Sequence, residues 1–127
     1  RCMQMATQGG KVDYINAHGT STPVGDMIEL QSIKKVYGDN IPPISSTKSL
    51  TGHSLGATGA QETIYSLLMM NNNFLVKSAN ITELDINAKD MNIILETKND
   101  IEVNSVLSNS FGFGGTNASI YLTKFNE

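Results

Sequence analysis

The chain has 127 residues, of which 39% are hydrophobic and 17% charged, and its formal net charge is −3. This length suits one domain, and the low share of charged residues indicates a surface partly buried against another domain or subunit. The charge gives no reason to expect nucleic acid or an anionic membrane as a partner. No apolar run approaches the ~20 residues of a membrane span.

The single cysteine, Cys2, excludes an internal disulfide and fits a reducing compartment, so we expect a cytoplasmic protein. The chain begins at Arg1 without a methionine, and residues 1–6 read as the end of a helix. We therefore expect a fragment of a longer protein, with Cys2 as a packing residue.

The first part of the sequence predicts a strand, a helix and a second strand. Residues 12–18 alternate between apolar and polar, which is typical of a strand. Thr22 is expected to cap a helix that starts at Pro23 and ends at Gly38. Residues 44–47 then predict a short strand.

The second part predicts a helix and three strands. A helix is expected over 55–70, and its first half is rich in small residues that permit close approach of a neighbouring backbone. Strands are expected over 91–97, 105–110 and 117–125, with a glycine-rich turn at 111–116. Strands alternating with helices indicate a largely parallel sheet, and the last two strands should pair antiparallel.

Both histidines of the chain lie in turns at the ends of predicted elements. His18 ends the first strand, and His53 precedes the helix of small residues. Functional sites of α/β sheets gather beyond the carboxyl ends of the strands, so both positions fit a site. They also fit ordinary turn histidines bonded to backbone. Two histidines and a distant Cys2 do not supply the three or four ligands of a metal site, so we expect no metal.

Three further patterns have competing interpretations. Residues 52–56, Gly-His-Ser-Leu-Gly, are close to a serine-hydrolase motif around Ser54. The glycines of 112–115 precede a β-rich segment and so indicate a tight turn with backbone N–H groups near a ligand, not a dinucleotide site. Lys48 and Glu29 are either solvated charges or a pair that tunes the protonation of the histidines.

Three segments resemble motifs of the β-ketoacyl-acyl carrier protein synthases, the condensing enzymes of fatty acid synthesis. They are NAHGTSTPVGD at 16–26 (first histidine), STKSLTGHSLGA at 46–57 (lysine and second histidine) and NSFGFGGTN at 109–117 (glycine-rich loop). The resemblance spans essentially the whole chain and displaces the hydrolase interpretation. Ser54 is more similar to the type I enzymes.

The resemblance implies a thiolase-like α/β fold. Residues 1–127 would be the C-terminal domain, a mixed five-stranded sheet with helices, and thus one half of an enzyme layered α-β-α-β-α. The nucleophilic cysteine would lie in the absent N-terminal half, so this piece alone should not catalyse condensation. Family members are homodimers, and we expect the same here.

The resemblance also implies a reaction, decarboxylative Claisen condensation of an acyl thioester with malonyl-acyl carrier protein. His18 and His53 would donate hydrogen bonds to the enolate oxygen, and the Phe113 N–H would join an oxyanion hole. The acyl carrier protein would be the partner. No cofactor is expected beyond the phosphopantetheine that carries the substrates.

Four polar residues receive supporting roles from the same resemblance. Thr20 and Thr22 would hydrogen-bond the phosphopantetheine arm. Lys48 would favour a neutral His53, and Glu29 would hold Lys48 in a partly buried charge pair.

The loop 111–116 is expected to gate the acyl tunnel. Phe113 would block the tunnel at rest and swing aside when an acyl chain enters, with Gly114 as a hinge and Phe111 lining the site. A rigid turn whose phenylalanines fill the core is the competing interpretation. A polyketide ketosynthase or a non-catalytic chain-length subunit of the same fold would carry the same motifs.

Overall fold

The computed structural model describes residues 1–125, and they build one mixed sheet of four strands. The strand order is β2-β1-β3-β4, where β1 is Tyr14–Asn16, β2 Ile44–Ser45, β3 Ser105–Phe111 and β4 Asn117–Thr123. Strand β1 runs parallel to both β2 and β3, and β4 is antiparallel to β3. The α/β class, the mixed sheet and the antiparallel final pair are thus confirmed.

Helices precede the first strand and connect the strands that follow. They are α1 (Cys2–Thr7), α2 (Gly25–Tyr37), α3 (Lys48–Thr51) and α4 (Thr58–Asn72), with single 3₁₀ turns η1 (Leu55–Ala57), η2 (Ile86–Ala88) and η3 (Phe113–Gly115). Helix α2 ends at Tyr37, and Gly38 stops it as predicted, with φ of 60°. It begins at Gly25, two residues later than predicted, and the Thr22 hydroxyl accepts a hydrogen bond from Gly25 N at 3.1 Å, the contact expected of a capping residue. None of these helices is long and apolar enough to cross a membrane.

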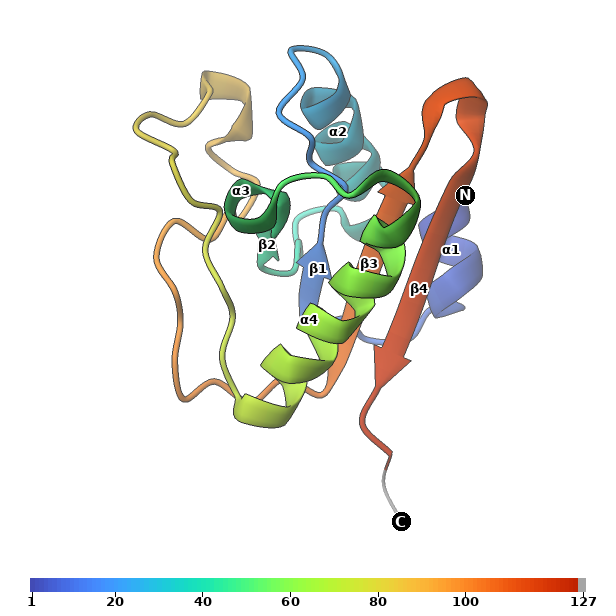
Figure 1. The fold of residues 1–127 in the computed structure, drawn as a ribbon, viewed down its shortest axis with the longest axis vertical. Helices are drawn as coiled ribbons and strands as arrows, with labels where there is room; N and C mark the ends of the chain where they lie inside the picture. Colours follow the sequence, from blue (N-terminus) through green and yellow to red (C-terminus); the bar gives the residue numbers. More distant parts are fainter. Residues whose placement is uncertain (126–127) are drawn as a thin grey trace.

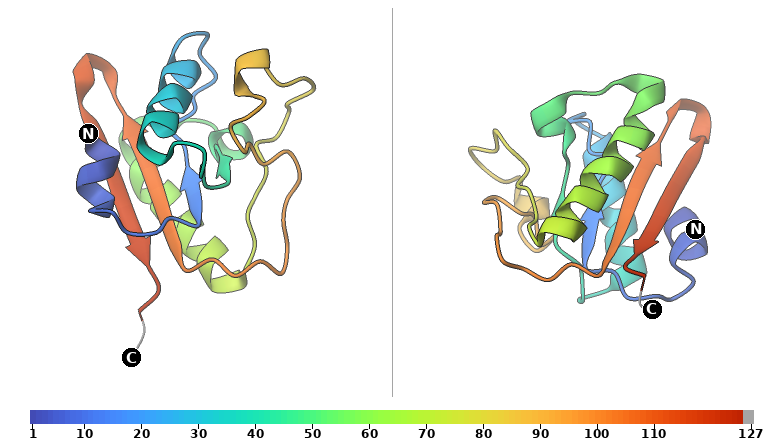
Figure 2. Two further views of the ribbon diagram at one scale, coloured as in Figure 1. Left: turned by 180° about the vertical axis from the view of Figure 1, so that it is seen from behind. Right: turned by 60° about the horizontal axis from the view of Figure 1, so that its bottom comes forward.

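The helices cover both faces of the sheet, with α4 in front in Figure 1 and α1 and α2 behind it (Figures 1 and 2). Adjacent strand residues point to opposite faces, so each strand contributes to two cores. Tyr14 and its register partner Val106 pack with Met69 of α4. Ile15 and Leu107 pack on the other face among side chains of α1 and α2.

The predicted strand at 91–97 is wrong, and the described sheet has four strands instead of five. Only Ile93 pairs there, by an isolated parallel bridge to Ile44 of β2. Strand β2 has two residues, so it offers little edge to extend a neighbour, and Asn92 bends the segment with φ of 51°. The segment therefore occupies the place of an edge strand without forming one.

Parallel pairing brings the segments that follow three strands to one edge of the sheet. His18 follows β1, Lys48 and His53 follow β2, and Phe111 ends β3. Residues 48–51, expected as part of the turn that carries His53, form the short helix α3. A tight bend at Leu55, with φ of 51°, then leads into η1 and α4.

Candidate active site

The two histidine rings lie side by side at this edge. Their centroids are 5.4 Å apart, and the ring planes are nearly perpendicular at 87°. Phe111 also lies beside His18, with a centroid distance of 6.4 Å. Residues 35 positions apart in sequence thus face one small volume, which suits two donors aimed at one atom.

Hydrogen bonds to Nδ1 fix the tautomer of His53. Its Nδ1 lies 2.9 Å from the Thr58 hydroxyl and accepts a hydrogen bond from Leu55 N at 3.3 Å. A ring nitrogen that accepts a backbone N–H carries no proton when the ring is neutral, so Nε2 is the donor. The ring itself is exposed, so Nε2 is available to a ligand.

His18 sits in a more enclosed environment. Its backbone N–H donates to Glu29 Oε1 at 2.9 Å, while its ring Nδ1 is buried without a hydrogen-bond partner in the described residues. Burial, followed by the charges of Lys48 and His53, lowers the pKa of the His18 ring, and Asp26 opposes this shift. The ring is therefore neutral at pH 7 and able to act as an N–H donor.

We expect His18 to titrate below its ordinary pKa of 6.5 when its ring proton signals are followed by NMR. Because the unfolded chain then binds more protons than the folded one, His18 lowers stability as the pH falls from 6.5 toward the folded pKa. Lys48→Met should move the His18 pKa upward, and Lys11→Met, at an exposed site, should not. A His18 pKa at or above 6.5 would contradict this environment.

Glu29 does not hold Lys48, contrary to the sequence-based expectation. It is 5% exposed, and its carboxylate accepts from His18 N, Gly19 N and the Asn109 amide at 2.9, 2.9 and 3.1 Å. Burial raises the pKa of Glu29, and these donors and the charge of Lys48 oppose the rise. Glu29 instead fixes the backbone of the turn that carries His18.

Lys48 pairs with Glu62 of α4, which sequence reasoning missed. Both side chains are almost fully buried, and Thr47 Oγ1 lies 3.5 Å from the same carboxylate oxygen. Burial raises the pKa of Glu62, opposed first by its hydrogen bond to Lys48. The sequence did contain an indication that Glu62 is buried. Glu62 is the only charged residue of α4, and it lies one turn from Thr58 and from Ser66, which are both buried.

The two threonines after His18 occupy the turn before α2. Thr20 is half-buried, and Thr22 is exposed. Backbone N–H groups of Ser21 and Thr22 donate to Asp26 Oδ1 at 3.1 and 3.4 Å, so the first turn of α2 holds this loop.

The glycine-rich loop leaves Phe113 in solvent. Its side chain is fully exposed, whereas Phe111 lies partly buried beside His18. Gly114 and Gly115 have φ of 75° and 82°, which glycine adopts without strain. A hydrogen bond from Gly112 N to Thr116 O at 2.8 Å closes the loop. Within residues 1–125, therefore, Phe113 fills no core.

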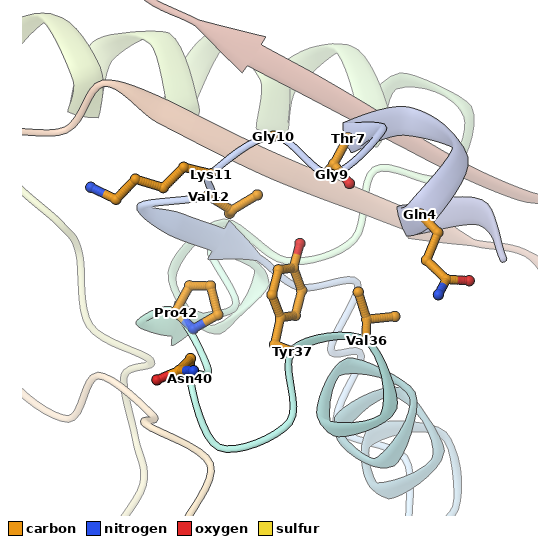
Figure 3. Close-up of a pocket in the computed structure, with 10 residues that line it drawn as sticks. All are labelled: Gln4, Thr7, Gly9, Gly10, Lys11, Val12, Val36, Tyr37, Asn40 and Pro42. Atoms are coloured by element: carbon orange, nitrogen blue, oxygen red, sulfur yellow. The ribbon is translucent and has the colours of Figure 1, made fainter.

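A hollow of about 590 Å³ lies at the opposite end of the sheet, between α1, the start of β1 and the end of α2 (Figure 3). Its ionisable groups are Lys11, which pairs with Asp13 at 2.8 Å, and Tyr37, whose pKa is raised by burial. It is remote from the histidines and brings no reactive group together. Among residues 1–125, no three His, Cys, Asp or Glu side chains cluster as metal ligands would.

Comparison with known proteins identifies the family. Residues 1–82 match the family described as "Beta-ketoacyl synthase, C-terminal domain". The chain is 59% identical over 99% of its length to 3-oxoacyl-[acyl-carrier-protein] synthase 1 of Haemophilus influenzae. The chain belongs to the β-ketoacyl synthase family. It spans about a third of that relative, 32% of its length.

Solved structures of β-ketoacyl synthases and ketosynthases share the fold. A β-ketoacyl synthase from Burkholderia phymatum superposes with a TM-score of 0.87 at 39% identity, over 98% of this chain and 31% of that one. A type II polyketide ketosynthase in complex with its acyl carrier protein superposes with a TM-score of 0.92 at 31% identity, over 98% and 32%. The thiolase-like fold inferred from the motifs is thus confirmed for this β-ketoacyl synthase domain.

Proposed function

We propose that this chain is the C-terminal part of a 3-oxoacyl-acyl carrier protein synthase, an acyltransferase of fatty acid elongation. The observation that carries the proposal is the pair of histidine rings, 5.4 Å apart, at the carboxyl edge of a β-ketoacyl synthase domain. The identity of 59% to a synthase 1, against 31% to a polyketide ketosynthase, supports the fatty acid branch of the family. It also agrees with Ser54, the residue that favours the type I enzymes.

In the proposed reaction, the malonyl C–C bond to the carboxylate breaks and carbon dioxide leaves. The electron pair moves into the thioester, whose oxygen becomes negative. Nε2–H of His53 and the N–H of neutral His18 stabilise this oxygen, each contributing ~3 kcal/mol. The resulting carbanion attacks the carbonyl carbon of the acyl thioester held on a cysteine of the N-terminal part, and the Phe113 N–H joins the oxyanion hole there. A new C–C bond forms, the acyl C–S bond breaks, and the cysteine leaves as a thiolate.

The substrates would arrive on the phosphopantetheine of an acyl carrier protein, with no other cofactor. A solved relative binds such a carrier protein, which supports this partner. Thr20 and Thr22, in the turn that follows His18, would hydrogen-bond the pantetheine arm. A cytoplasmic location follows from this pathway.

The N-terminal half and a second subunit are the other proposed partners. Helix α4 and the turn before it expose large apolar side chains on the face away from the sheet. Left in water, such a patch is costly, and its burial would supply an interface. The exposed residues are Leu55, Ile64, Leu67 and Leu68. This surface supports packing of α4 in the middle layer of an α-β-α-β-α enzyme.

The function is tested with the complete synthase that contains this chain. Supplied with acyl- and malonyl-carrier protein, it should release carbon dioxide and form a lengthened 3-oxoacyl product, measured by mass spectrometry of the carrier protein. A purified, folded synthase that releases no carbon dioxide from malonyl-carrier protein would overturn the proposal.

Gly114→Ala should slow acyl transfer to the cysteine at least ~10-fold, because a side chain at φ of 75° disturbs the loop that carries the Phe113 N–H. No atom lies within 4 Å of the added Cβ, so the stability cost is backbone strain of about 1 kcal/mol. Gly9→Ala is the control: it has φ of 83°, equal open space and no place in the site. Equal acyl-transfer rates in both variants would contradict a role of this loop in acyl transfer.

A further inference from the structure

A chain of hydrogen bonds joins β4 to the turn that carries His18. The Ser119 hydroxyl donates to Asn109 Oδ1 at 2.8 Å, and the Asn109 amide donates to Glu29 Oε1 at 3.1 Å. Glu29 in turn accepts the N–H groups of His18 and Gly19, each at 2.9 Å. The chain thus crosses β4, β3, α2 and the end of β1.

Asn109 is the centre of this chain. It is fully buried in β3 and lies opposite Ser119 in the strand register. The carboxylate of Glu29 can only accept, so the Asn109 NH₂ group must face it and Oδ1 must face the Ser119 hydroxyl. The amide is therefore held in one orientation from both sides.

The charge of Glu29 depends on these N–H donors. Glu29 is buried, and within residues 1–125 no lysine or arginine forms a salt bridge with it. Asn109 is the only side-chain donor of its three, while His18 and Gly19 donate from the backbone turn. Loss of Asn109 would remove one of the two donors of Oε1 and leave each carboxylate oxygen with a single backbone N–H, so the carboxylate would be held less firmly.

We propose that Asn109, supported by Ser119, is a positioning residue of the condensing site. It orients the Glu29 carboxylate, which holds the His18–Gly19 backbone so that the His18 ring faces His53. Asn109 and Ser119 also stand at the root of the glycine-rich loop, so one carboxylate ties the loop and the histidine turn together. This role rests on the proposed function.

The kinetic test uses the complete synthase. Asn109→Leu keeps the size and removes the donor, and it should slow malonyl decarboxylation about 30-fold, because a small displacement of His18 misplaces its ring. Acylation of the cysteine should change far less. Ser119→Ala should cost about 3-fold in decarboxylation, the loss of one neutral hydrogen bond. Ser119→Thr, which keeps the hydroxyl, should restore the rate.

A second readout does not depend on catalysis. Amide hydrogen exchange of Gly19 should be faster in Asn109→Leu, because its acceptor Glu29 then has one donor fewer to hold it. The amide of Ala17, which donates to Ser45 O at 2.9 Å, is the internal control and should keep its protection. An inactive wild-type synthase would defeat the proposed function alone, since the exchange experiment still tests the hydrogen-bond chain.

Two outcomes overturn the proposal. One is an active wild-type enzyme whose Asn109→Leu and Ser119→Ala variants keep full decarboxylation and full protection of Gly19. The other is an equal loss of decarboxylation and acylation together with a lower Tm, which would reveal a general packing role. If Asn109→Leu fails to fold, the two Ser119 variants decide. Equal decarboxylation rates in Ser119→Ala and Ser119→Thr would contradict the positioning role.

Discussion

Replacing His53 with alanine in the complete synthase should slow malonyl decarboxylation about 100- to 1,000-fold, the cost of one oxyanion donor. The physical reason is the tautomer: Nδ1 is occupied by Thr58 and Leu55, so Nε2–H is the group that faces the developing charge. Transfer of the acyl group to the cysteine should continue at nearly the wild-type rate, because in the proposed reaction the histidine acts on the malonyl half-reaction. Radioactive carbon dioxide release and burst acylation measure the two steps separately.

His53→Asn supplies the matched control for this prediction. Its amide retains an N–H donor, although shorter, so decarboxylation should lie between those of the wild type and His53→Ala. Unchanged carbon dioxide release in His53→Ala would contradict the role of His53. Equal loss of both half-reactions would point to a damaged fold, which the Tm of the variant would reveal.

Lys48→Met should destabilise the protein by about 3–5 kcal/mol, because it leaves the Glu62 carboxylate buried and unpaired. The side chains of Lys48 and Glu62 are 5% and 1% exposed, so water cannot replace the lost partner. The pKa of Glu62, already raised by burial, should rise further, and Lys48→Met should therefore lose less stability at acidic pH than at neutral pH. Urea unfolding at two pH values measures both effects.

The double variant Lys48→Met/Glu62→Gln separates the pair from its surroundings. Removing both charges should restore a large part of the lost free energy of unfolding, since no buried charge remains. Lys11→Met, which breaks an exposed pair with Asp13, should change stability little. A Lys48→Met variant as stable as Lys11→Met would show that Glu62 is not held by Lys48.

Sequence reasoning located the histidines because turn residues and strand ends are local features. The alternation up to His18 and the glycine-rich turn before the last strand are visible in the residues themselves, and β1, β3 and β4 form there. Parallel pairing then places His18 and His53 together without knowledge of any side-chain contact.

Partners of buried charges were not predictable in the same way. Glu29 and Lys48 were expected to pair. In the structure, Glu29 accepts hydrogen bonds from three N–H donors, and Lys48 forms its salt bridge with Glu62. The choice depends on which face of α4 turns toward the sheet, a tertiary property. The wrong prediction of a strand at 91–97 also has a tertiary cause. A strand needs a neighbouring strand edge to pair with, and β2 ends after two residues.

The central claim, that His18 and His53 donate to one oxygen, is tested most directly by a crystal structure of the complete synthase with a non-reactive malonyl thioester analogue. We expect the thioester carbonyl oxygen within about 2.7–3.2 Å of a ring nitrogen of each histidine. Phe111 should remain packed against His18. A bound analogue whose carbonyl oxygen contacts neither histidine, or only one of them, would contradict the account.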